Sequence, residues 1–147
     1  MSEHRLYPLV RERWDILVAI ALGGALGSLA RWAVGEVLPH RAGQIPWSTF
    51  LENVSGALLL GALMVFVLDL WPTTRYVRPF LAVGVLGGYT TFSTYMLDTR
   101  TLVDRGAVGP ALAYLFGTLL AGLVAVWAGI LLARTAVRLL TRRRRKR

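Results

Sequence analysis

The stretch GGYTTFSTY, residues 87 to 95, combines two features that a membrane-spanning helix normally avoids. It begins with two adjacent glycines and continues with four aliphatic hydroxyls, those of Thr90, Thr91, Ser93 and Thr94, set among three aromatic rings. Adjacent glycines beside serine and threonine favour a helix break, and a break inside a membrane requires partners for the freed backbone groups. The alternative is that the glycines only permit close helix packing. The pattern predicts a helix broken at Gly87–Gly88.

This stretch lies in the third of four apolar segments. The chain has 147 residues, of which 55% are hydrophobic, and its mean hydropathy of +0.53 is typical of a membrane protein. Each segment is long enough to cross a bilayer, because a spanning helix needs about 20 apolar residues. The sequence therefore predicts an all-α membrane protein with four transmembrane helices, at about 14–38, 47–71, 77–97 and 110–133. They form one membrane domain, residues 14–135, between a basic segment, 1–13, and an Arg-rich tail, 136–147.

The basic residues predict the orientation of the chain. Of 17 lysines and arginines, 13 lie on the side of the membrane that holds both termini and the second loop, and three lie on the other side. Positively charged flanks stay in the cytoplasm, so we expect a multi-pass protein of the cell membrane with both termini cytoplasmic. The tail TRRRRKR is most simply a disordered anchor for anionic lipid headgroups. Charge placed in this way does not indicate nucleic-acid binding, despite a net charge of +9.

An enzyme is not expected from the sequence. The chain has no cysteine, and no pairing of a nucleophile with a base or cluster of metal ligands is visible. His4 and His40 are isolated and lie outside the predicted spans. No cleavable signal peptide is evident, since residues 1 to 15 carry several charges and no apolar core.

Several polar residues inside the spans are candidates for function, because their burial in lipid is costly. Arg31 either extends its charge to the interface or attracts anions into a vestibule. Glu52 either lies at the membrane boundary near Trp47 or has a functional role. Asn53 either joins helices by hydrogen bonds or faces a polar pathway. Two further polar residues, Tyr114 and Thr118, share one face of the fourth helix, where they are either interfacial and self-bonded or part of a polar track.

Three motifs resemble those of the Fluc/CrcB family of fluoride channels. They are GGALGSLARW (23 to 32), STFLENVSGALLLG (48 to 61) and GVLGGYTTFSTY (84 to 95), and the similarity covers about residues 16 to 135. The resemblance implies an antiparallel, dual-topology dimer with two pores and a structural, non-transported Na⁺ at its centre. It implies that the carbonyls of Gly87 and Thr90 bind this ion. The implied fluoride-pore residues are Asn53, Phe92, Ser93, Thr94, Tyr95, Tyr114 and Thr118, and Arg31 would lie at the vestibule.

The chain departs from the family's usual pattern in three respects. Tyr95 stands where phenylalanine is usual, and Glu52 and Ser55 stand where apolar residues are usual. A phenol adds a hydrogen-bond donor, and Glu52 would oppose fluoride unless it is protonated or paired with an arginine. The uneven charge distribution also argues against insertion in both orientations, so we expect pairing with a homologous subunit of opposite orientation.

The resulting functional hypothesis is a channel that passively exports fluoride from the cytoplasm and lowers its toxicity. One alternative is a small proton-coupled exporter of dual topology that uses Glu52 as its carrier carboxylate. Another is a non-conducting subunit that completes a dimer with an active homologue.

Overall fold

The computed structural model describes residues 13–41, 43–69 and 75–145, and within these ranges the chain is helical apart from its connections. Four stretches are long and apolar enough to cross a membrane, namely Trp14–Val37, Trp47–Val67, Arg78–Asp104 and Val108–Leu139. The all-helical, four-span prediction is therefore confirmed. Most of the predicted N-terminal segment and the predicted end of the second span at residue 71 lie outside the described residues.

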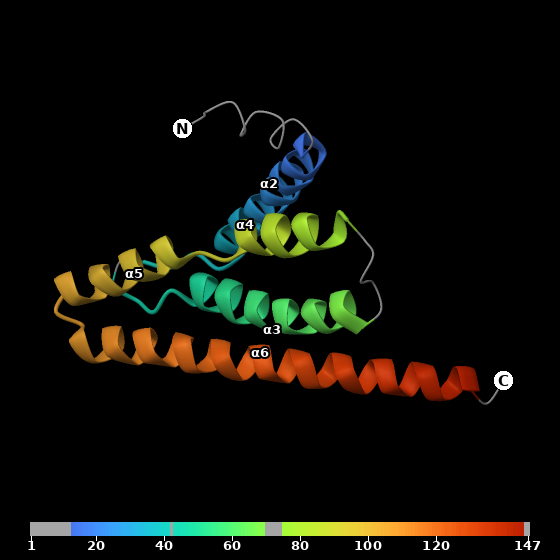
Figure 1. Cartoon of the computed structure of the whole chain (residues 1–147). Helices are drawn as coiled ribbons and strands as arrows, with labels where there is room; N and C mark the ends of the chain where they lie inside the picture. The colour runs from blue at the N-terminus through green and yellow to red at the C-terminus, as the bar shows by residue number, and fades with distance from the viewer. Residues whose placement is uncertain (1–12, 42, 70–74, 146–147) are drawn as a thin grey trace, which may run out of the picture.

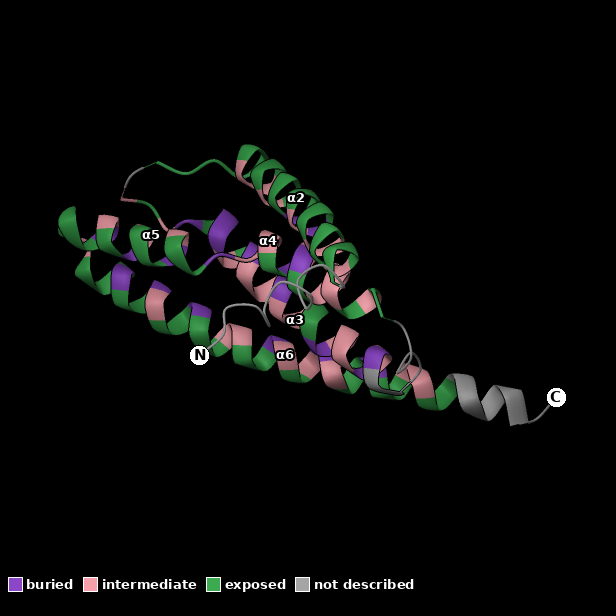
Figure 2. Ribbon diagram, turned by 45° about the horizontal axis from the view of Figure 1, so that its top comes forward, coloured by how far each residue is buried: buried purple, intermediate pink, exposed green. Residues whose placement is uncertain are grey.

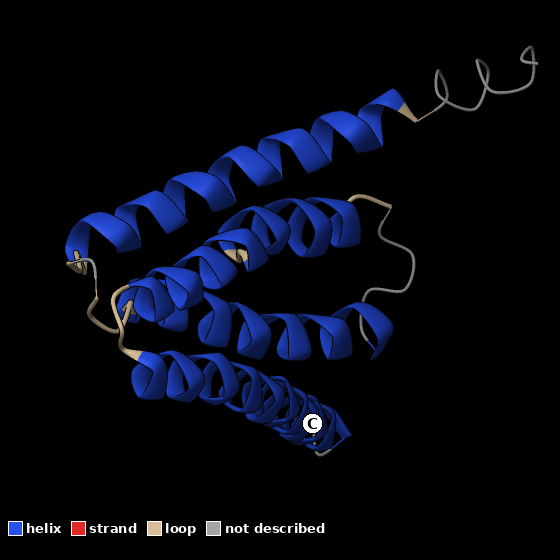
Figure 3. Cartoon of the chain, turned by 90° about the vertical axis from the view of Figure 1, so that its left-hand side faces the viewer, coloured by secondary structure: helices blue, strands red, loops and turns tan. Residues whose placement is uncertain are grey.

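The four spans form a layered arrangement. α2 (Trp14–Val37) and α6 (Val108–Arg145) lie on opposite sides of the molecule, with α3 (Trp47–Asp69) and the third span between them (Figures 1 and 3). The third span consists of η2 (Arg78–Leu86), which is π-helical, α4 (Gly87–Tyr89) and α5 (Phe92–Asp104). Its predicted end at residue 97 is wrong, since α5 continues for two further turns.

α2 packs against η2 and α4 through glycines on both sides. A Cβ added at Gly23 or Gly27 would collide with the carbonyl oxygen of Phe80 or Val85, and one added at Gly84 or Gly88 would meet the backbone of α2. Helix backbones can approach this closely only where side chains are absent. These four glycines therefore allow α2 and the third span to pack closely.

α3 and α6 are held together in the same way. A Cβ at Gly61 would collide with the carbonyl oxygen of Val126, and one at Gly129 would collide with that of Leu58.

α5 joins α6 by a tight turn in which Gly106 has a φ of +75°. There the amide of Gly106 bonds the carbonyl of Val103 and the amide of Ala107 bonds that of Leu102. This pair of bonds, with glycine in the left-handed conformation, ends a helix sharply and reverses the chain.

A polar clasp connects the beginning of α2 to the residues before η2. The Asp15 carboxylate accepts hydrogen bonds from the Arg75 guanidinium, at 3.1 Å, and from the Tyr76 hydroxyl. The hydrogen bond to Asp15 raises the pKa of the Tyr76 phenol above its usual value. Because these groups are exposed, the ion pair contributes little to stability. The clasp positions two chain segments 60 residues apart.

Apolar side chains cover much of the outer surface, as lipid-facing helices require. Within α2 only Gly23 and Gly27 are buried, and Figure 2 shows most of this helix as exposed. A buried apolar cluster lies between α5 and α6 and contains Tyr95, Leu102, Ala111 and Tyr114. The interior is therefore thin, and the polar groups described below lie beside it.

α6 is longer than a bilayer requires. Its 38 residues span about 57 Å at 1.5 Å per residue, whereas the hydrocarbon core is about 30 Å thick. Figure 1 shows its end extending beyond α3. The prediction that TRRRRKR is disordered is wrong for residues 141–145, which continue the helix, while 146–147 lie outside the described residues.

Candidate functional site: the interrupted third helix and its groove

The third helix is interrupted at Thr90–Thr91, three residues later than predicted. Gly87 is helical, with φ −65° and ψ −35°, and α4 ends at Tyr89. The chain becomes extended at Thr90 (ψ 155°) and Thr91 (φ −147°, ψ 123°) before α5 begins at Phe92. The prediction of a broken third helix is confirmed, but its position at the double glycine is wrong. Gly88 instead packs against the carbonyl of Gly24, and Gly87 is exposed.

Asn53 of α3 holds the interruption open. Its Nδ2 donates to the carbonyl oxygen of Thr91 at 3.0 Å, and its Oδ1 accepts from the amide of Thr91 at 2.8 Å. The side-chain amide thus pairs with both backbone groups of one residue, as a neighbouring strand would. Asn53 joins two helices, as one of the two sequence interpretations proposed. Its amide nitrogen carries a second N–H, which these two bonds do not use.

The pairing changes the hydrogen bonding of two backbone carbonyls. In a regular α-helix the amide of Thr91 would donate to the carbonyl of Gly87, and that of Thr94 to the carbonyl of Thr90. The Thr91 amide instead donates to Asn53, and the Thr94 amide donates to the Thr91 hydroxyl at 3.2 Å. The carbonyls of Gly87 and Thr90 therefore lose their regular helical donors. These are the two oxygens that the resemblance assigns to Na⁺.

Hydroxyls gather at the first turn of α5. Thr91 is the N-cap; its hydroxyl donates to Thr94 Oγ1 at 3.0 Å and lies 3.3 Å from that of Ser93. Thr90 donates its hydroxyl to Leu86 and packs its methyl group against Gly56, where no Cβ would fit. Thr91, which the sequence did not single out for the pore, connects this cluster to Asn53.

The aromatic residues form a row across α5 and α6. The rings of Phe92 and Tyr95 lie 6.0 Å apart, and those of Tyr95 and Tyr114 lie 5.4 Å apart. Phe92 is 74% exposed, whereas Tyr95 is only 8% exposed. The Tyr95 hydroxyl donates to the backbone carbonyl of Leu115, so the extra donor in this chain is already used within the subunit.

A groove of about 360 Å³ runs beside these residues between α3, the interruption and α6. Among the predicted pore residues, it is lined by Asn53, Phe92, Tyr95 and Thr118, and the predicted Na⁺ ligand Thr90 lines it as well. The Thr118 hydroxyl and that of Tyr114, one turn away on α6, are buried and have no hydrogen-bond partner among the described residues. Buried hydroxyls without partners are uncommon and call for water or a ligand. The groove thus combines a mostly apolar lining with a few hydrogen-bond donors.

Three charged residues, Glu52, Arg31 and Asp98, interact with one another. Glu52 is 3% exposed, so its carboxyl group is buried within the protein. Arg31, half-buried on α2, attracts it, while the negative charge of Asp98 on α5 repels it. Arg31 thus lies within electrostatic range of Glu52.

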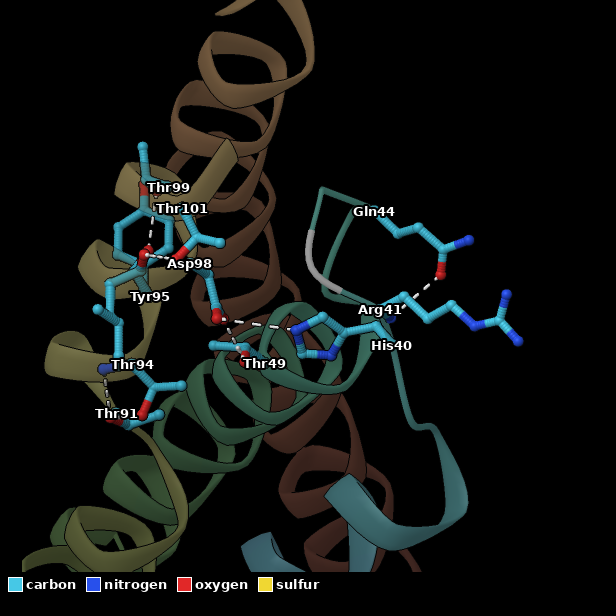
Figure 4. Close-up of polar contacts among 11 residues, drawn as sticks. His40, Arg41, Gln44, Thr49, Thr91, Thr94, Tyr95, Asp98, Thr99 and Thr101 are labelled. Carbon is cyan, nitrogen blue, oxygen red and sulfur yellow. Dashed lines mark hydrogen bonds and ion pairs between the residues drawn. The ribbon is translucent and has the colours of Figure 1, made fainter. Parts of the chain in front are cut away.

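Sequence reasoning missed a polar cluster that is assembled around Asp98. The hydroxyl of Thr49 donates to Asp98 Oδ2 at 2.8 Å, and His40 Nε2 lies 3.8 Å from Asp98 Oδ1 (Figure 4). The buried Tyr114 hydroxyl lies near the same carboxylate but makes no hydrogen bond to it. The description of His40 as isolated is therefore wrong. Asp98 lies one residue past the predicted end of the third span, so only a longer helix would have indicated it.

Sequence comparison assigns the chain to a known family. The profile described as "CrcB-like protein, Camphor Resistance (CrcB)" matches residues 18–130. The chain belongs to the CrcB family. A Streptomyces avermitilis protein named fluoride-specific ion channel FluC 3 is 51% identical over 127 residues, covering 86% of this chain and 62% of that protein. The CrcB-family chain thus spans less than two thirds of the length of this relative.

Two further relatives match most of their own length. FluC 2 of Nocardia farcinica is 52% identical over 121 residues, covering 82% of this chain and 86% of the relative. FluC of Rhodospirillum centenum is 43% identical over 123 residues, covering 83% and 98%. Both are named fluoride-specific ion channels. The CrcB family therefore represents a class of ion channels and not of enzymes, as the sequence predicted.

Proposed function

We propose that this chain is a subunit of a fluoride channel that passively exports fluoride from the cytoplasm. The groove along Asn53, Phe92, Tyr95 and Thr118 is the observation that carries the proposal. Fluoride is small and strongly hydrated, so its path must replace water by hydrogen-bond donors and by the positive edges of aromatic rings. The spare N–H of Asn53, the unpartnered hydroxyls of Tyr114 and Thr118, and the hydroxyls of Ser93 and Thr94 provide such donors.

The carbonyls of Gly87 and Thr90 fit a resident Na⁺. Na⁺ prefers oxygen ligands, and carbonyls at a helix interruption supply them without side-chain charge. When bound, the ion would supply positive charge that offsets the desolvation of the anion. The Asn53–Thr91 pairing supports this assignment because it diverts the amides that would otherwise bond these two carbonyls.

The surface of the chain and the distribution of its basic residues support a dimer. The exposed apolar face of α2 and the exposed Gly87 suit an antiparallel, dual-topology contact with another subunit within the lipid bilayer. The 13-to-three distribution of basic residues favours one orientation, with both termini cytoplasmic in the cell membrane. We therefore propose a homologous subunit of opposite orientation as the partner.

The test is fluoride efflux from liposomes that contain the full chain, alone and co-purified with a homologous subunit. We expect efflux that a fluoride electrode detects and that is absent from protein-free liposomes. Replacement of both Phe92 and Tyr95 by isoleucine should abolish efflux through this chain's own rings. Undiminished efflux in that double variant would instead favour a non-conducting subunit that completes the pore of its partner.

A proton-coupled exporter is the second candidate, and the burial of Glu52 is what favours it. A coupled exporter needs a carboxylate that titrates in each cycle, whereas a channel does not. Glu52→Gln separates the two functions. Retained efflux in this variant supports the channel, and complete loss in a folded variant supports the exporter.

A further inference from the structure

The cluster around Asp98 is continuous with the groove. Thr49 lies one helical turn before Asn53 on α3, Asp98 lies three residues after Tyr95 on α5, and Tyr114 lies four residues before Thr118 on α6. Each of these three groove-lining residues thus has a neighbour in the cluster one turn, about 6 Å, away on its own helix. The cluster is therefore the continuation of the groove toward the loop between α2 and α3.

His40 closes this end from the loop. Its imidazole lies against Asp98, and the two side chains line a small cavity of about 20 Å³ with Gly43, Gln44 and Thr101. The side chain of His40 is 31% exposed and that of Asp98 is 13% exposed. His40 thus lies at the surface and Asp98 lies inside, so the pair stands between solvent and the end of the groove. Figure 4 shows His40 reaching from the loop toward Asp98.

The charge of this pair depends on the imidazole. Asp98 alone places a negative charge at the end of a path for an anion, which repels it. Histidine is the side chain that gains a positive charge between pH 8 and pH 5. A charged imidazole 3.8 Å from the carboxylate would cancel much of its field.

Other ionisable groups near the pair do not remove this dependence. Glu52 on α3 faces Asp98 and has the same sign of charge, while Arg31 on α2 acts on Glu52. Tyr114 on α6 is neutral as a phenol, and the side chain of Arg105 lies near Gly43 of the loop. Glu52 adds to the repulsion of an anion, and the side chain of Arg41, next to His40 in the loop, points away from Asp98 (Figure 4).

We propose that His40 and Asp98 form a charge-compensated entrance to the fluoride path, in which protonation of His40 offsets the Asp98 carboxylate and speeds fluoride entry. His40 is a positioning residue, because it acts on the anion through Asp98. The proposal rests on the proposed function, and it makes the channel more active in acid medium. If Asp98 instead aided fluoride by binding a cation, acidification would release that cation and slow efflux. The two explanations therefore predict opposite pH dependences of efflux.

The experiment compares efflux at pH 6.0 and pH 8.0, equal on both sides of the membrane, with the leak of protein-free liposomes subtracted. We expect wild-type efflux to be about three- to fivefold faster at pH 6.0, the effect of one nearby unit charge in a wet site. His40→Gln should be slow at both pH values, and His40→Arg should be fast at both. His4→Gln, the matched control at the chain's other histidine, should keep the wild-type ratio.

Two outcomes overturn the proposal in distinguishable ways. If His40→Gln conducts and keeps the wild-type ratio of efflux at pH 6.0 to efflux at pH 8.0, the role proposed for His40 is wrong, while the proposed channel function is unaffected. If no assembly conducts at either pH, the proposed function fails and the entrance fails with it. A flux-independent measurement accompanies both: at pH 6.0, His40→Gln should unfold at a lower temperature than wild type, because it lacks the imidazole that lies against Asp98. Equal unfolding temperatures of the two proteins contradict the pairing itself.

Discussion

The hydroxyl of Tyr95 donates a hydrogen bond to the backbone carbonyl of Leu115, and this bond joins α5 to α6 beside the groove. Since Tyr95 is buried between the rings of Phe92 and Tyr114, the bond determines how its ring is oriented. The hydroxyl that distinguishes this chain from the usual family pattern is therefore a structural group. A phenylalanine at this position would present the same ring edge without the tether.

Tyr95→Phe tests this tether. We expect a loss of about 1 kcal/mol in the free energy of unfolding, because one partly buried hydrogen bond is removed while the ring is kept. Fluoride efflux should persist, since the hydroxyl does not face the groove as a free donor. Thermal unfolding in detergent, followed by tryptophan fluorescence, measures the first quantity. Abolished efflux in a folded Tyr95→Phe protein would mean that the hydroxyl contacts the anion directly.

Asn53→Ala should be far more damaging. Loss of the side-chain amide leaves both backbone groups of the buried Thr91 without their partner, at a cost of about 2–4 kcal/mol. Efflux should fall about tenfold or more, because the interruption and the donor near the groove are lost together. Ser55→Ala on the same helix is the control, with a smaller loss expected because its hydroxyl bonds the carbonyls of its own helix and the Tyr89 hydroxyl, and its removal strands no backbone amide. Similar stability of the two variants would show that Asn53 does not hold the interruption.

The contact between α2 and the third span predicts a sharp difference between neighbouring glycines. Gly27→Ala places a methyl group against the carbonyl of Val85 and should destabilise the fold by about 1–3 kcal/mol. Gly24→Ala adds the same methyl group where no atom lies within 4 Å, and it should leave stability unchanged or slightly raised. Unfolding temperatures of the two variants provide the measurement. Equal effects would mean that α2 is not packed as described.

The turn between α5 and α6 should also be sensitive to substitution. Gly106→Ala forces a side chain into the left-handed region at φ +75°, which costs about 1–2 kcal/mol. Gly109→Ala, in the first turn of α6 and with no atom within 4 Å of an added Cβ, is the matched control. Guanidinium or thermal unfolding should separate the two, and a neutral Gly106→Ala would contradict the turn geometry.

Removal of Na⁺ provides a test of the carbonyl site that does not depend on transport. If the carbonyls of Gly87 and Thr90 bind Na⁺, exchange of Na⁺ for N-methylglucamine should lower the unfolding temperature, as loss of a ligand specific to the folded state does. Exchange for choline should have the same effect, because neither organic cation fits between the carbonyls. An unfolding temperature that is independent of the cation would count against a resident Na⁺.

The sequence alone supported the broad description of the molecule. Four apolar segments, each near 20 residues long, predicted four helices, because a membrane leaves few ways to satisfy backbone groups. The GGYTTFSTY stretch predicted an interrupted third helix. These features follow from local composition, so they could be recognised without knowing which helices touch.

Only the tertiary structure decided where the third helix breaks and which groups meet there. The break depends on Asn53, 38 residues from Thr91, whose amide outcompetes the helical bonds of that residue. The union of His40, Thr49 and Asp98 likewise joins three separate segments, and no local pattern predicts it. Local sequence determines which backbone groups can leave a helix, but a contact between helices determines which ones do, because a freed group in a membrane needs a partner from elsewhere in the fold.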